Sequence, residues 1–432
     1  MVNRYTLIAL LAVLLPFAAQ TAAADEALRV WTRSSKDGRK TYDAIAAAFT
    51  KKTGIRVEYF NAQTDFEQRL ARAAVGAKLP DVIVNELGTV GQLVNMGVAA
   101  SIDRTQVIGG EDLLDSAWQA ARLPDGHYYG VPVSVQTHVL YIRRDWREKL
   151  GLPVPRTWED LAQLARAFTE RDPDGNGRRD TYGLAFPGST ARGYAAWYLS
   201  SFLFAAGGDF VRRGTDGRPH ASLDEPAAVQ TLAFFRRLVC EDRSVQPNAV
   251  NASTQETNKS FSAGQSGMYL SGPYHFALFD QEPGRAHYEA VPLPAGPQGG
   301  RASMAGGELA YITRASKQPQ AAMKFVEFLI SPEGQTLGMR PPPSGMSVVR
   351  LPVNQKLDAA AAHEDARWSM VLDEYREHGH PMPQVRNWSR LQQLAADGFN
   401  AMLARCSTDI PGDLKVLNRR FEAELARQEA QQ

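Results

Sequence analysis

The sequence has few cysteines, almost no net charge and, beyond its first 24 residues, no long apolar run. Lysine and arginine together number 48, against 47 aspartates and glutamates. Without an excess of positive charge, a chain has no general attraction to a nucleic-acid backbone or to an anionic membrane surface. We therefore expect no nucleic-acid partner. No apolar run after residue 24 approaches the roughly 18 residues of a membrane span.

The two cysteines, Cys240 and Cys406, are too few for a disulfide scaffold and lack the spacing of metal ligands. In an oxidising compartment they can pair with each other, or they can remain two buried free thiols. The sequence leaves both possibilities open. In either case a hydrophobic core must hold the fold. The content of 44% hydrophobic and 22% charged residues over 432 positions is typical of a globular protein with two or three domains.

The common motifs of hydrolases and nucleotide-binding enzymes are also missing. The nearest approach to a Gly-x-Ser-x-Gly nucleophile elbow ends in Met268, and there is no His-Glu-x-x-His, no P-loop and no Gly-x-Gly-x-x-Gly after a strand. We expect no cofactor and no catalytic residue. The paired carboxylates of glycoside hydrolases are assembled in space rather than in sequence, so a carbohydrate-active enzyme remains an alternative.

The first 24 residues have the features of a secretory signal. Arg4 precedes an apolar stretch at residues 7–17, and three alanines at 22–24 provide a cleavage site. The stretch is short and ends in small residues, which favours cleavage over an uncleaved anchor helix. The segment has no cysteine that could carry a lipid. These features predict a free periplasmic protein.

The rest of the chain alternates strand and helix patterns. Strands are expected at residues 28–31, 55–59, 80–84, 139–142, 268–270, 287–293 and 310–312. Helices are expected at 42–53, 66–75, 229–239 and 320–330, and from Pro332 onward. Thr157 followed three residues later by Asp160 predicts another helix that begins with a capping box. From residue 358 to the end the pattern is almost wholly helical.

One segment is similar to a calcium-binding loop. Oxygen-bearing side chains stand at positions 1, 3, 5 and 9 of a twelve-residue EF-hand pattern, and they are Asp172, Asp174, Asn176 and Asp180. Gly183 occupies the last position, where a bidentate glutamate belongs, and two arginines inside the loop oppose a cation. We interpret the segment as a turn stabilised by its own side chains, with calcium as the alternative.

Several motifs occur together in a fixed order. They include FTKKTGIRV at 49–57, LPDV at 79–82, YGVP at 129–132, PRTWEDL at 155–161, the 172–183 loop, SGP at 271–273, and residues 306–307 and 321–335. This ordered set resembles the extracellular solute-binding proteins of ABC importers, the maltose-binding-protein-like family. The resemblance covers nearly the whole chain after the signal. Each motif alone is weak, but the order is specific for fold and general role.

The resemblance implies an α/β protein with the two-lobe periplasmic-binding-protein fold of type II, a cleft between the lobes and a helical C-terminal region. Both lobes would be discontinuous in sequence, because chain crossings are implied near residues 132–133, 293–294 and 340–343. The expected N-terminal lobe is 25–132 plus 294–339, and the expected C-terminal lobe is 133–293 plus 340–432. Proteins of this family are not enzymes.

The resemblance also implies binding residues. Aromatic side chains suit the apolar face of a sugar ring, and the family's cleft aromatics correspond to Trp197, Tyr274 and Trp388, for which core packing is the competing interpretation. Five polar residues stand where loops leave strand ends, the usual place for ligands in open α/β sheets; they are Ser35, Lys36, Asn85, Glu86 and Gln136. Further candidates for polar contacts are Gly307, Glu308 and Arg386.

Two of these positions depart from the maltose-binding pattern. Asn85 stands where that pattern has a tryptophan, and Gln136 where it has an acid, and these departures weigh against maltose itself as the ligand. The expected function is a periplasmic receptor that binds a carbohydrate and delivers it to the membrane permease subunits of an ABC importer, acting as a monomer. The alternative within binding proteins is another polar solute, such as glycerol phosphate, a sugar acid or a polyamine.

Overall fold

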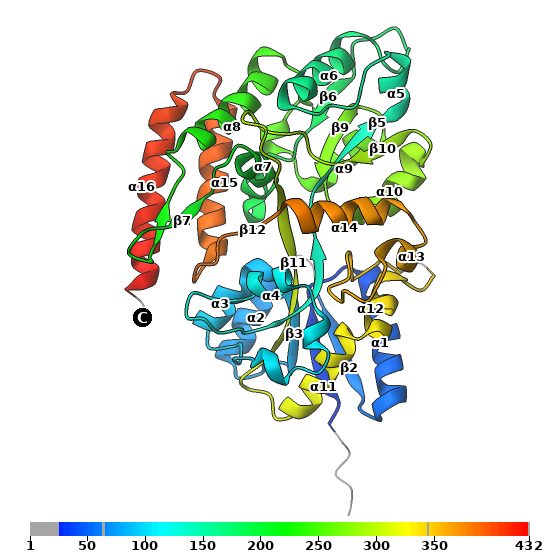
Figure 1. The fold of residues 1–432 in the computed structure, drawn as a ribbon, viewed down its shortest axis with the longest axis vertical. Helices are drawn as coiled ribbons and strands as arrows, with labels where there is room; N and C mark the ends of the chain where they lie inside the picture. Colours follow the sequence, from blue (N-terminus) through cyan, green and yellow to red (C-terminus); the bar gives the residue numbers. More distant parts are fainter. Residues whose placement is uncertain (1–25, 63–64, 344, 431–432) are drawn as a thin grey trace, which may run out of the picture.

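The computed structural model describes residues 26–62, 65–343 and 345–430. The predicted signal sequence at residues 1–24 lies outside the described residues. Within the described part of the chain, no helix is both long enough and apolar enough to cross a membrane. The fold is α/β with two lobes and a helical C-terminal region, as predicted (Figure 1).

The lower lobe in Figure 1, called the N-lobe below, is built around a six-stranded sheet with the strand order β12-β11-β3-β1-β2, in which β12 is Gly379–Pro381 and β4 pairs with β11. β1 runs parallel to β2 and β3, and β11 runs antiparallel to β3 and β4. The continuous apolar run predicted for β3 is fully buried, because helices cover both faces. The main elements are β1 (Leu28–Thr32), α1 (Lys36–Thr53), β2 (Val57–Asn61), α2 (Phe66–Val75), β3 (Val82–Glu86), η1 (Leu87–Thr89), α3 (Val90–Asn95), α4 (Asp115–Ala120), β4 (Val131–Gln136), β11 (Ser303–Ile312), α11 (Pro319–Ile330) and α12 (Pro332–Met339).

The upper lobe, called the C-lobe, has a four-stranded sheet with the order β10-β5-β9-β6. Only the β6–β9 pair is parallel within this sheet. Helices α15 and α16 pack beside α7 and α8 at the left of Figure 1. The elements are β5 (Val139–Arg143), α5 (Arg144–Lys149), α6 (Trp158–Glu170), β6 (Tyr182–Ala185), η4 (Ala191–Gly193), α7 (Tyr194–Ala205), β7 (Val211–Arg213), β8 (Pro219–Ala221), α8 (Pro226–Arg236), η5 (Arg237–Glu241), α9 (Thr254–Ser262), β9 (Ser266–Ser271), η7 (Pro273–His275), α10 (Phe276–Phe279), η8 (Asp280–Gly284), β10 (Tyr288–Val291), α15 (Trp388–Ala404) and α16 (Ile410–Glu429).

Local sequence signals set many of these boundaries. Thr157 caps α6, and Asp160 completes the predicted capping box. Helix α1 ends at Gly54, whose φ of 79° is a left-handed conformation that glycine adopts without strain. Ser331 caps α12 by accepting a hydrogen bond from the Gly334 amide.

The chain passes between the lobes along strands. β4 ends in the N-lobe sheet at Gln136, and β5 begins in the C-lobe sheet at Val139. Residues beyond 343 still contact the N-lobe, since Leu351 pairs with Val135. The chain therefore passes from the N-lobe sheet to the C-lobe sheet a few residues after the crossing predicted at 132–133. The third crossing follows residue 351. The domain boundaries drawn from the sequence remain a prediction.

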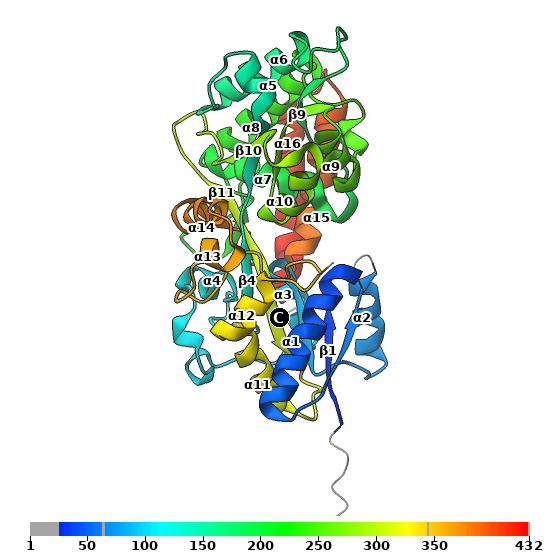
Figure 2. The ribbon, with the colours of Figure 1, turned by 90° about the vertical axis from the view of Figure 1, so that its right-hand side faces the viewer.

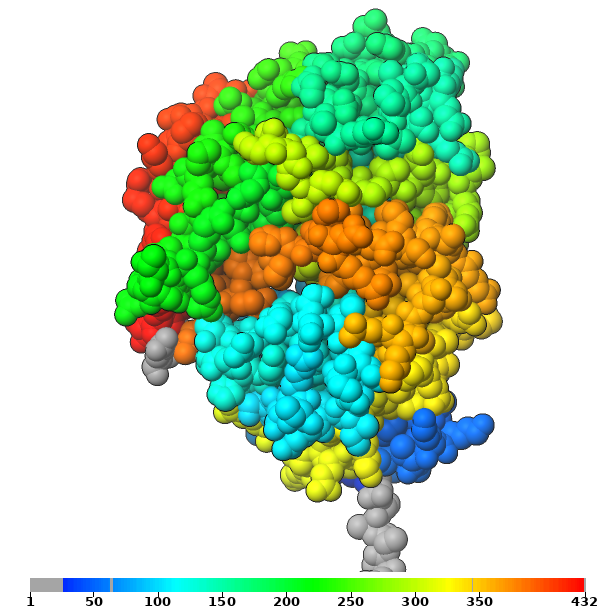
Figure 3. Space-filling view, in the orientation of Figure 1, coloured from blue at the N-terminus to red at the C-terminus, as the bar shows by residue number. Residues whose placement is uncertain are grey.

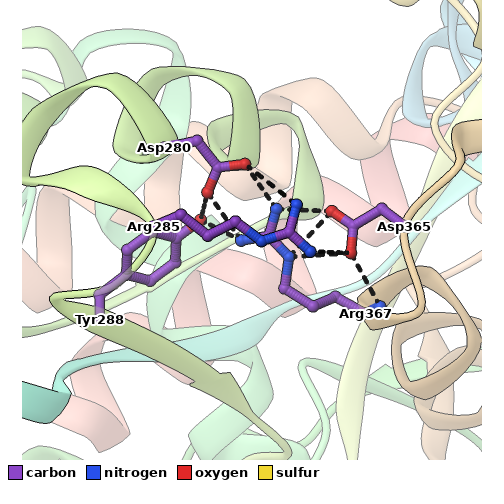
Figure 4. A network of polar contacts seen from close by, with 5 residues as sticks. All are labelled: Asp280, Arg285, Tyr288, Asp365 and Arg367. Carbon is purple, nitrogen blue, oxygen red and sulfur yellow. Dashed lines mark hydrogen bonds and ion pairs between the residues drawn. The ribbon is translucent and has the colours of Figure 1, made fainter.

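The third crossing runs through α13 (Ala359–His363), α14 (Arg367–His378) and β12 (Gly379–Pro381). An ion-pair network fastens the start of α14 to the C-lobe (Figure 4). Arg367 contacts Asp280 at 2.6 Å and also pairs with Asp365, which Arg285 contacts at 3.1 Å. The Tyr288 hydroxyl donates to Asp280 at 2.6 Å. The network thus fastens the start of α14 to Asp280 and Tyr288, and the orange segment around α14 lies between the upper and lower lobes in the space-filling view (Figure 3).

The two cysteines are joined by a disulfide bond in the structure. Cys240 lies in η5, directly after α8, and Cys406 follows α15. The bond connects positions 166 residues apart, both within the C-lobe. It therefore ties the C-terminal helices to the body of that lobe.

Candidate ligand-binding cleft

A cavity of about 430 Å³ lies between the lobes. Its N-lobe wall is formed where β1 and β3 end, by the middle of β11 and by the segment from Met346 to Arg350. Its C-lobe wall is formed by η4, α7, α9 and the segment after β9, and the start of α15 closes one side. In Figure 2, α9 and α10 of the upper lobe stand above α1 of the lower lobe.

Paired charges dominate the N-lobe wall. Arg33, just after β1, donates a hydrogen bond to Glu86 at the end of β3. Arg350 Nη1 donates to Glu308 Oε1 at 3.2 Å. Glu86 and Glu308 are partners in the β3–β11 register, so the sheet itself places the two carboxylates side by side. Because adjacent carboxylates repel each other, each of the two is compensated by its own arginine.

The surroundings shift the pKa values of these groups in opposite directions. For Glu308, burial raises the pKa above its usual value, and this outweighs the attraction of Arg350. For Glu86, burial also acts upward, but Arg33, Arg192 and Arg350 together lower the net pKa. Burial raises the pKa of Tyr42, beside Glu308, well above its usual range, so its phenol stays protonated.

The C-lobe wall is mainly aromatic. Helix α7 contributes Tyr194, Trp197 and Tyr198, and the segment after β9 contributes Tyr274 and His275. Burial lowers the pKa of His275 to about 3, so this histidine is uncharged at neutral pH. Apart from Arg192 in η4, whose carboxylate partners Glu67 and Glu86 lie in the N-lobe, the wall presents ring faces and neutral polar atoms.

Gly272 explains how Tyr274 reaches the cavity. A Cβ atom at position 272 would lie 2.2 Å from the Tyr274 ring, so the ring folds over a backbone that only glycine leaves open. The Tyr274 hydroxyl accepts a hydrogen bond from Ser271 at 3.3 Å. Across the cleft, the Arg350 guanidinium lies 5.9 Å from the centre of the Tyr274 ring, within the range of a cation–π contact.

Trp388 begins α15 and belongs both to the core and to the cavity wall. Only 3% of the residue is exposed, and its ring meets Phe210 edge-on with centroids 5.1 Å apart. It also lies against Gly88 of the N-lobe, where a Cβ would be 3.2 Å from Trp388 Cδ1. Its indole Nε1 is buried and has no hydrogen-bond partner.

The cavity brings together most of the residues predicted from the sequence. Those that line it are Ser35, Glu86, Gln136, Trp197, Tyr274, Gly307, Glu308 and Trp388. The Ser35 hydroxyl also caps α1, where it accepts a hydrogen bond from the Gly38 amide at 3.1 Å. Their roles toward a ligand remain predictions.

Three predicted residues do not line the cavity. Lys36 is exposed on the first turn of α1. Asn85 is fully buried, and its side chain accepts a hydrogen bond from the Glu86 amide at 2.8 Å. Successive side chains of a strand point to opposite faces, so Asn85 faces away from the cavity when Glu86 faces it. Arg386 contacts the N-lobe through its carbonyl, which accepts a hydrogen bond from Asn95 at 3.2 Å.

Other lining residues were not predicted, among them Arg33, Tyr42, Arg192, Asn258, His275 and Arg350. Arg33 and His275 adjoin predicted positions, so proximity to a strand end was an available signal for both. Arg350 lies in an irregular segment after α12, and Arg192 in a short turn. Only tertiary contacts place these two arginines at the cavity.

The loop from Asp172 to Asp180 uses its oxygen atoms internally. The Asp172 carboxylate accepts hydrogen bonds from the amides of Gly175, Asn176 and Gly177 at 3.0–3.1 Å. The Asn176 amide group donates to Asp174 and Asp180. Within the part of the chain that the structure describes, no group of three or more His, Cys, Asp or Glu side chains could hold a metal ion. These contacts fit the interpretation as a self-stabilised turn.

Residues 33–336 match the family of bacterial extracellular solute-binding proteins. The chain is 25% identical over 219 residues to the fructooligosaccharide ABC transporter substrate-binding protein FusA of Streptococcus pneumoniae, a match that covers 45% of this chain and 40% of that protein. It is 25% identical over 320 residues to the maltodextrin-binding protein MdxE of Bacillus subtilis, covering 71% of this chain and 70% of that protein. The chain thus spans less than half the length of some of these curated relatives.

Solved structures share the fold. The maltose-bound MalE3 of T. maritima superposes with a TM-score of 0.77 at 21% identity, covering 91% of this chain and 99% of that one. The GacH receptor of Streptomyces glaucescens gives a TM-score of 0.78 at 20% identity, covering 93% and 98%. Because the family match covers more than half of the sequence and the two-lobe fold agrees with it, the chain belongs to the bacterial extracellular solute-binding proteins.

Proposed function

We propose that the protein is a periplasmic carbohydrate receptor of an ABC importer, which binds its ligand in the interlobe cavity and delivers it to the permease subunits. It acts as a monomer and catalyses no reaction. The observation that carries this proposal is the pairing of two unlike walls. An aromatic wall suits the apolar face of a sugar ring, and a wall of charged and polar groups suits its hydroxyls.

The size of the site supports a small or oligomeric sugar. Its volume of about 430 Å³ falls within the range of roughly 300–1,000 Å³ typical of small-molecule sites. The names of FusA and MdxE connect relatives of this chain with fructooligosaccharides and maltodextrins. Both are uncharged polyhydroxyl ligands.

A second candidate is an anionic solute such as a sugar acid. Three arginines line the cavity, Arg33, Arg192 and Arg350, against the two glutamates Glu86 and Glu308. This small excess of positive charge favours an acidic group on the ligand. Glycerol phosphate falls in the same class, whereas a polyamine would meet the arginines unfavourably.

A thermal-shift screen tests both candidates. The panel contains fructooligosaccharides, maltooligosaccharides, galacturonate oligomers, glycerol phosphate and a polyamine. A ligand present at 100 times its dissociation constant stabilises the folded protein by about 2.7 kcal/mol. We expect a neutral oligosaccharide to give the largest shift, with one-to-one binding by calorimetry. A response to acids alone would replace the first candidate by the second, and release of products from a glycan would show an enzyme.

A further inference from the structure

A chain of charges crosses the mouth of the cleft. Arg192 in η4 of the C-lobe contacts Glu67 of α2 at 3.4 Å and Glu86 at the end of β3 at 4.0 Å, and both glutamates belong to the N-lobe. Arg33 of the N-lobe pairs with the same two carboxylates. Two glutamates thus lie between one arginine of their own lobe and one of the other lobe.

The backbone of η4 is held in an unusual conformation that presents Arg192. Arg192 has a φ of 57° and Gly193 a φ of 73°, two consecutive left-handed residues. Such a conformation is uncommon for arginine and persists only where surrounding contacts support it. The Gln392 side chain on α15 provides such contacts, because its amide donates to the carbonyls of Arg192 and Gly193 at 3.3 Å.

The lobes also meet beside this point. Trp388 lies against Gly88, and the Arg386 carbonyl lies so near Gly91 that a Cβ there would be 2.1 Å from it. Figures 1 and 2 both place the beginning of α15 next to α3. The structure thus has the lobes in contact at the mouth of the cleft as well as along the crossing strands.

We propose that Arg192 is a closure residue, which holds the two lobes together at the mouth of the cleft through Glu67 and Glu86 even when no ligand is bound. Ion pairs within one lobe, such as Arg69–Asp65, persist whether the lobes are open or closed. Pairs that Arg192 makes with the N-lobe exist only when the lobes are close, so they favour the closed state by their full interaction energy. When contacts of the protein itself stabilise the closed state, less of the free energy of ligand binding is spent on closing the lobes.

The proposal predicts a modest, salt-sensitive effect. Side chains in this cluster are 14–47% exposed, and ion pairs of this exposure shift an equilibrium by roughly two- to five-fold. Ions in solution screen such pairs, with a Debye length of about 10 Å at 0.1 M salt and about 3 Å at 1 M. Ligand-free protein should therefore open as salt is added.

Pulsed electron paramagnetic resonance can measure the open and closed populations directly. Spin labels are attached at Val75→Cys, at the exposed end of α2, and at Gln255→Cys, an exposed position on α9. Both native cysteines are in the disulfide bond, so the new thiols label selectively. Distances are recorded without ligand in 20 mM and 500 mM NaCl, for the labelled parent, for Arg192→Gln and for the charge-conserving Arg192→Lys.

We expect the open-to-closed ratio to rise about two- to five-fold in Arg192→Gln, and its dependence on salt to weaken. Arg192→Lys keeps the positive charge and should stay closer to the parent than Arg192→Gln does. Arg178→Gln, at an exposed arginine in the C-lobe loop of 172–180, is the matched control and should behave like the parent. Equal distance distributions in the parent and Arg192→Gln at low salt would overturn the proposal, as would an Arg192→Lys variant more open than Arg192→Gln. No ligand is used, so this result is independent of the carbohydrate assignment.

Discussion

The two walls of the cleft differ in the kinds of side chain that they present. The N-lobe wall carries paired ions, Arg33 with Glu86 at two strand ends and Arg350 with Glu308 of β11. The C-lobe wall consists of a helix and turns that carry aromatic rings, an uncharged histidine and one arginine, Arg192, whose carboxylate partners lie in the N-lobe. Added salt or the loss of a partner weakens an ion pair. Buried aromatic rings contribute through packing, so truncating one leaves a destabilising cavity, and a buried histidine is sensitive to protonation. The contrast means that a perturbation can be aimed at one wall at a time.

The lobes also differ in covalent support, because the disulfide lies wholly in the C-lobe. Replacing both Cys240 and Cys406 by alanine should destabilise the protein by about 5 kcal/mol, the chain-entropy value for a loop of 166 residues. Urea unfolding gives the free energy, and hydrogen exchange with mass spectrometry shows where protection is lost. We expect faster exchange in α8 and α15 than in the N-lobe sheet. Equal losses in both lobes would show that the lobes unfold as one unit.

Trp388 is the point where the aromatic wall reaches the core. Trp388→Ala should lower the free energy of unfolding by about 3–5 kcal/mol, because the ring is almost fully buried and leaves a cavity. If the ring covers a sugar face, the folded protein should also bind its ligand more weakly, with a loss of about 1–3 kcal/mol in binding free energy. Urea unfolding and calorimetric titration with the oligosaccharide from the screen separate the two effects.

Trp197→Ala is the matched comparison for Trp388. Trp197 lines the cavity but is only partly buried, so its loss should affect affinity more than stability. If both variants lose stability and keep full affinity, the aromatic wall is core and not a binding surface.

Much of the fold could be predicted from the sequence because its signals are local. Helix α2 has the predicted bounds, and the capping box at Thr157 and the stop at Gly54 act through residues three or four positions away. The short strand β12 was not predicted. Its sequence, Gly-His-Pro, has no strand pattern, and it forms because β11 provides a partner.

The site was predictable where it depends on strand ends. Glu86 lines the cavity because β3 ends there, and the alternation of strand side chains explains why Asn85 does not. Arg192 and Arg350 could not be found in this way. Contacts with Gln392 position the first, and pairing with Glu308 positions the second, each across more than 40 residues of sequence.

Acid should act on the C-lobe side of the cleft through His138, which lies beneath Trp197 with ring centroids 4.3 Å apart. Burial lowers the pKa of His138 to about 3, from 6.5 for the free side chain. Its contribution to stability is therefore complete above pH 6.5 and is lost as the pH falls toward 3. Between pH 7 and pH 5 the loss is about 2 kcal/mol.

The variant His138→Gln removes the contribution of His138 to the pH dependence of stability. The difference in unfolding free energy between pH 7 and pH 5, measured by urea titration, should shrink by about 2 kcal/mol relative to the parent. His127→Gln, at an exposed histidine of the N-lobe, serves as the control and should leave the difference unchanged. An unaltered pH dependence in His138→Gln would mean that this histidine does not become charged on unfolding.

The smallest effect is expected at the Tyr274 hydroxyl on the aromatic wall. Tyr274→Phe keeps the ring over Gly272 and removes only the acceptor for the Ser271 hydroxyl, a contact of 3.3 Å. A neutral hydrogen bond contributes about 1 kcal/mol, so affinity for the oligosaccharide and unfolding free energy should each change by no more than that. Tyr274→Ala, which removes the ring, should lose more affinity than Tyr274→Phe, because under the proposed function ring area rather than the hydroxyl would cover the sugar. Calorimetry on the two variants side by side measures that difference. If Tyr274→Phe loses as much affinity as Tyr274→Ala, this wall binds through its polar atoms, and the contrast between the walls is one of charge alone.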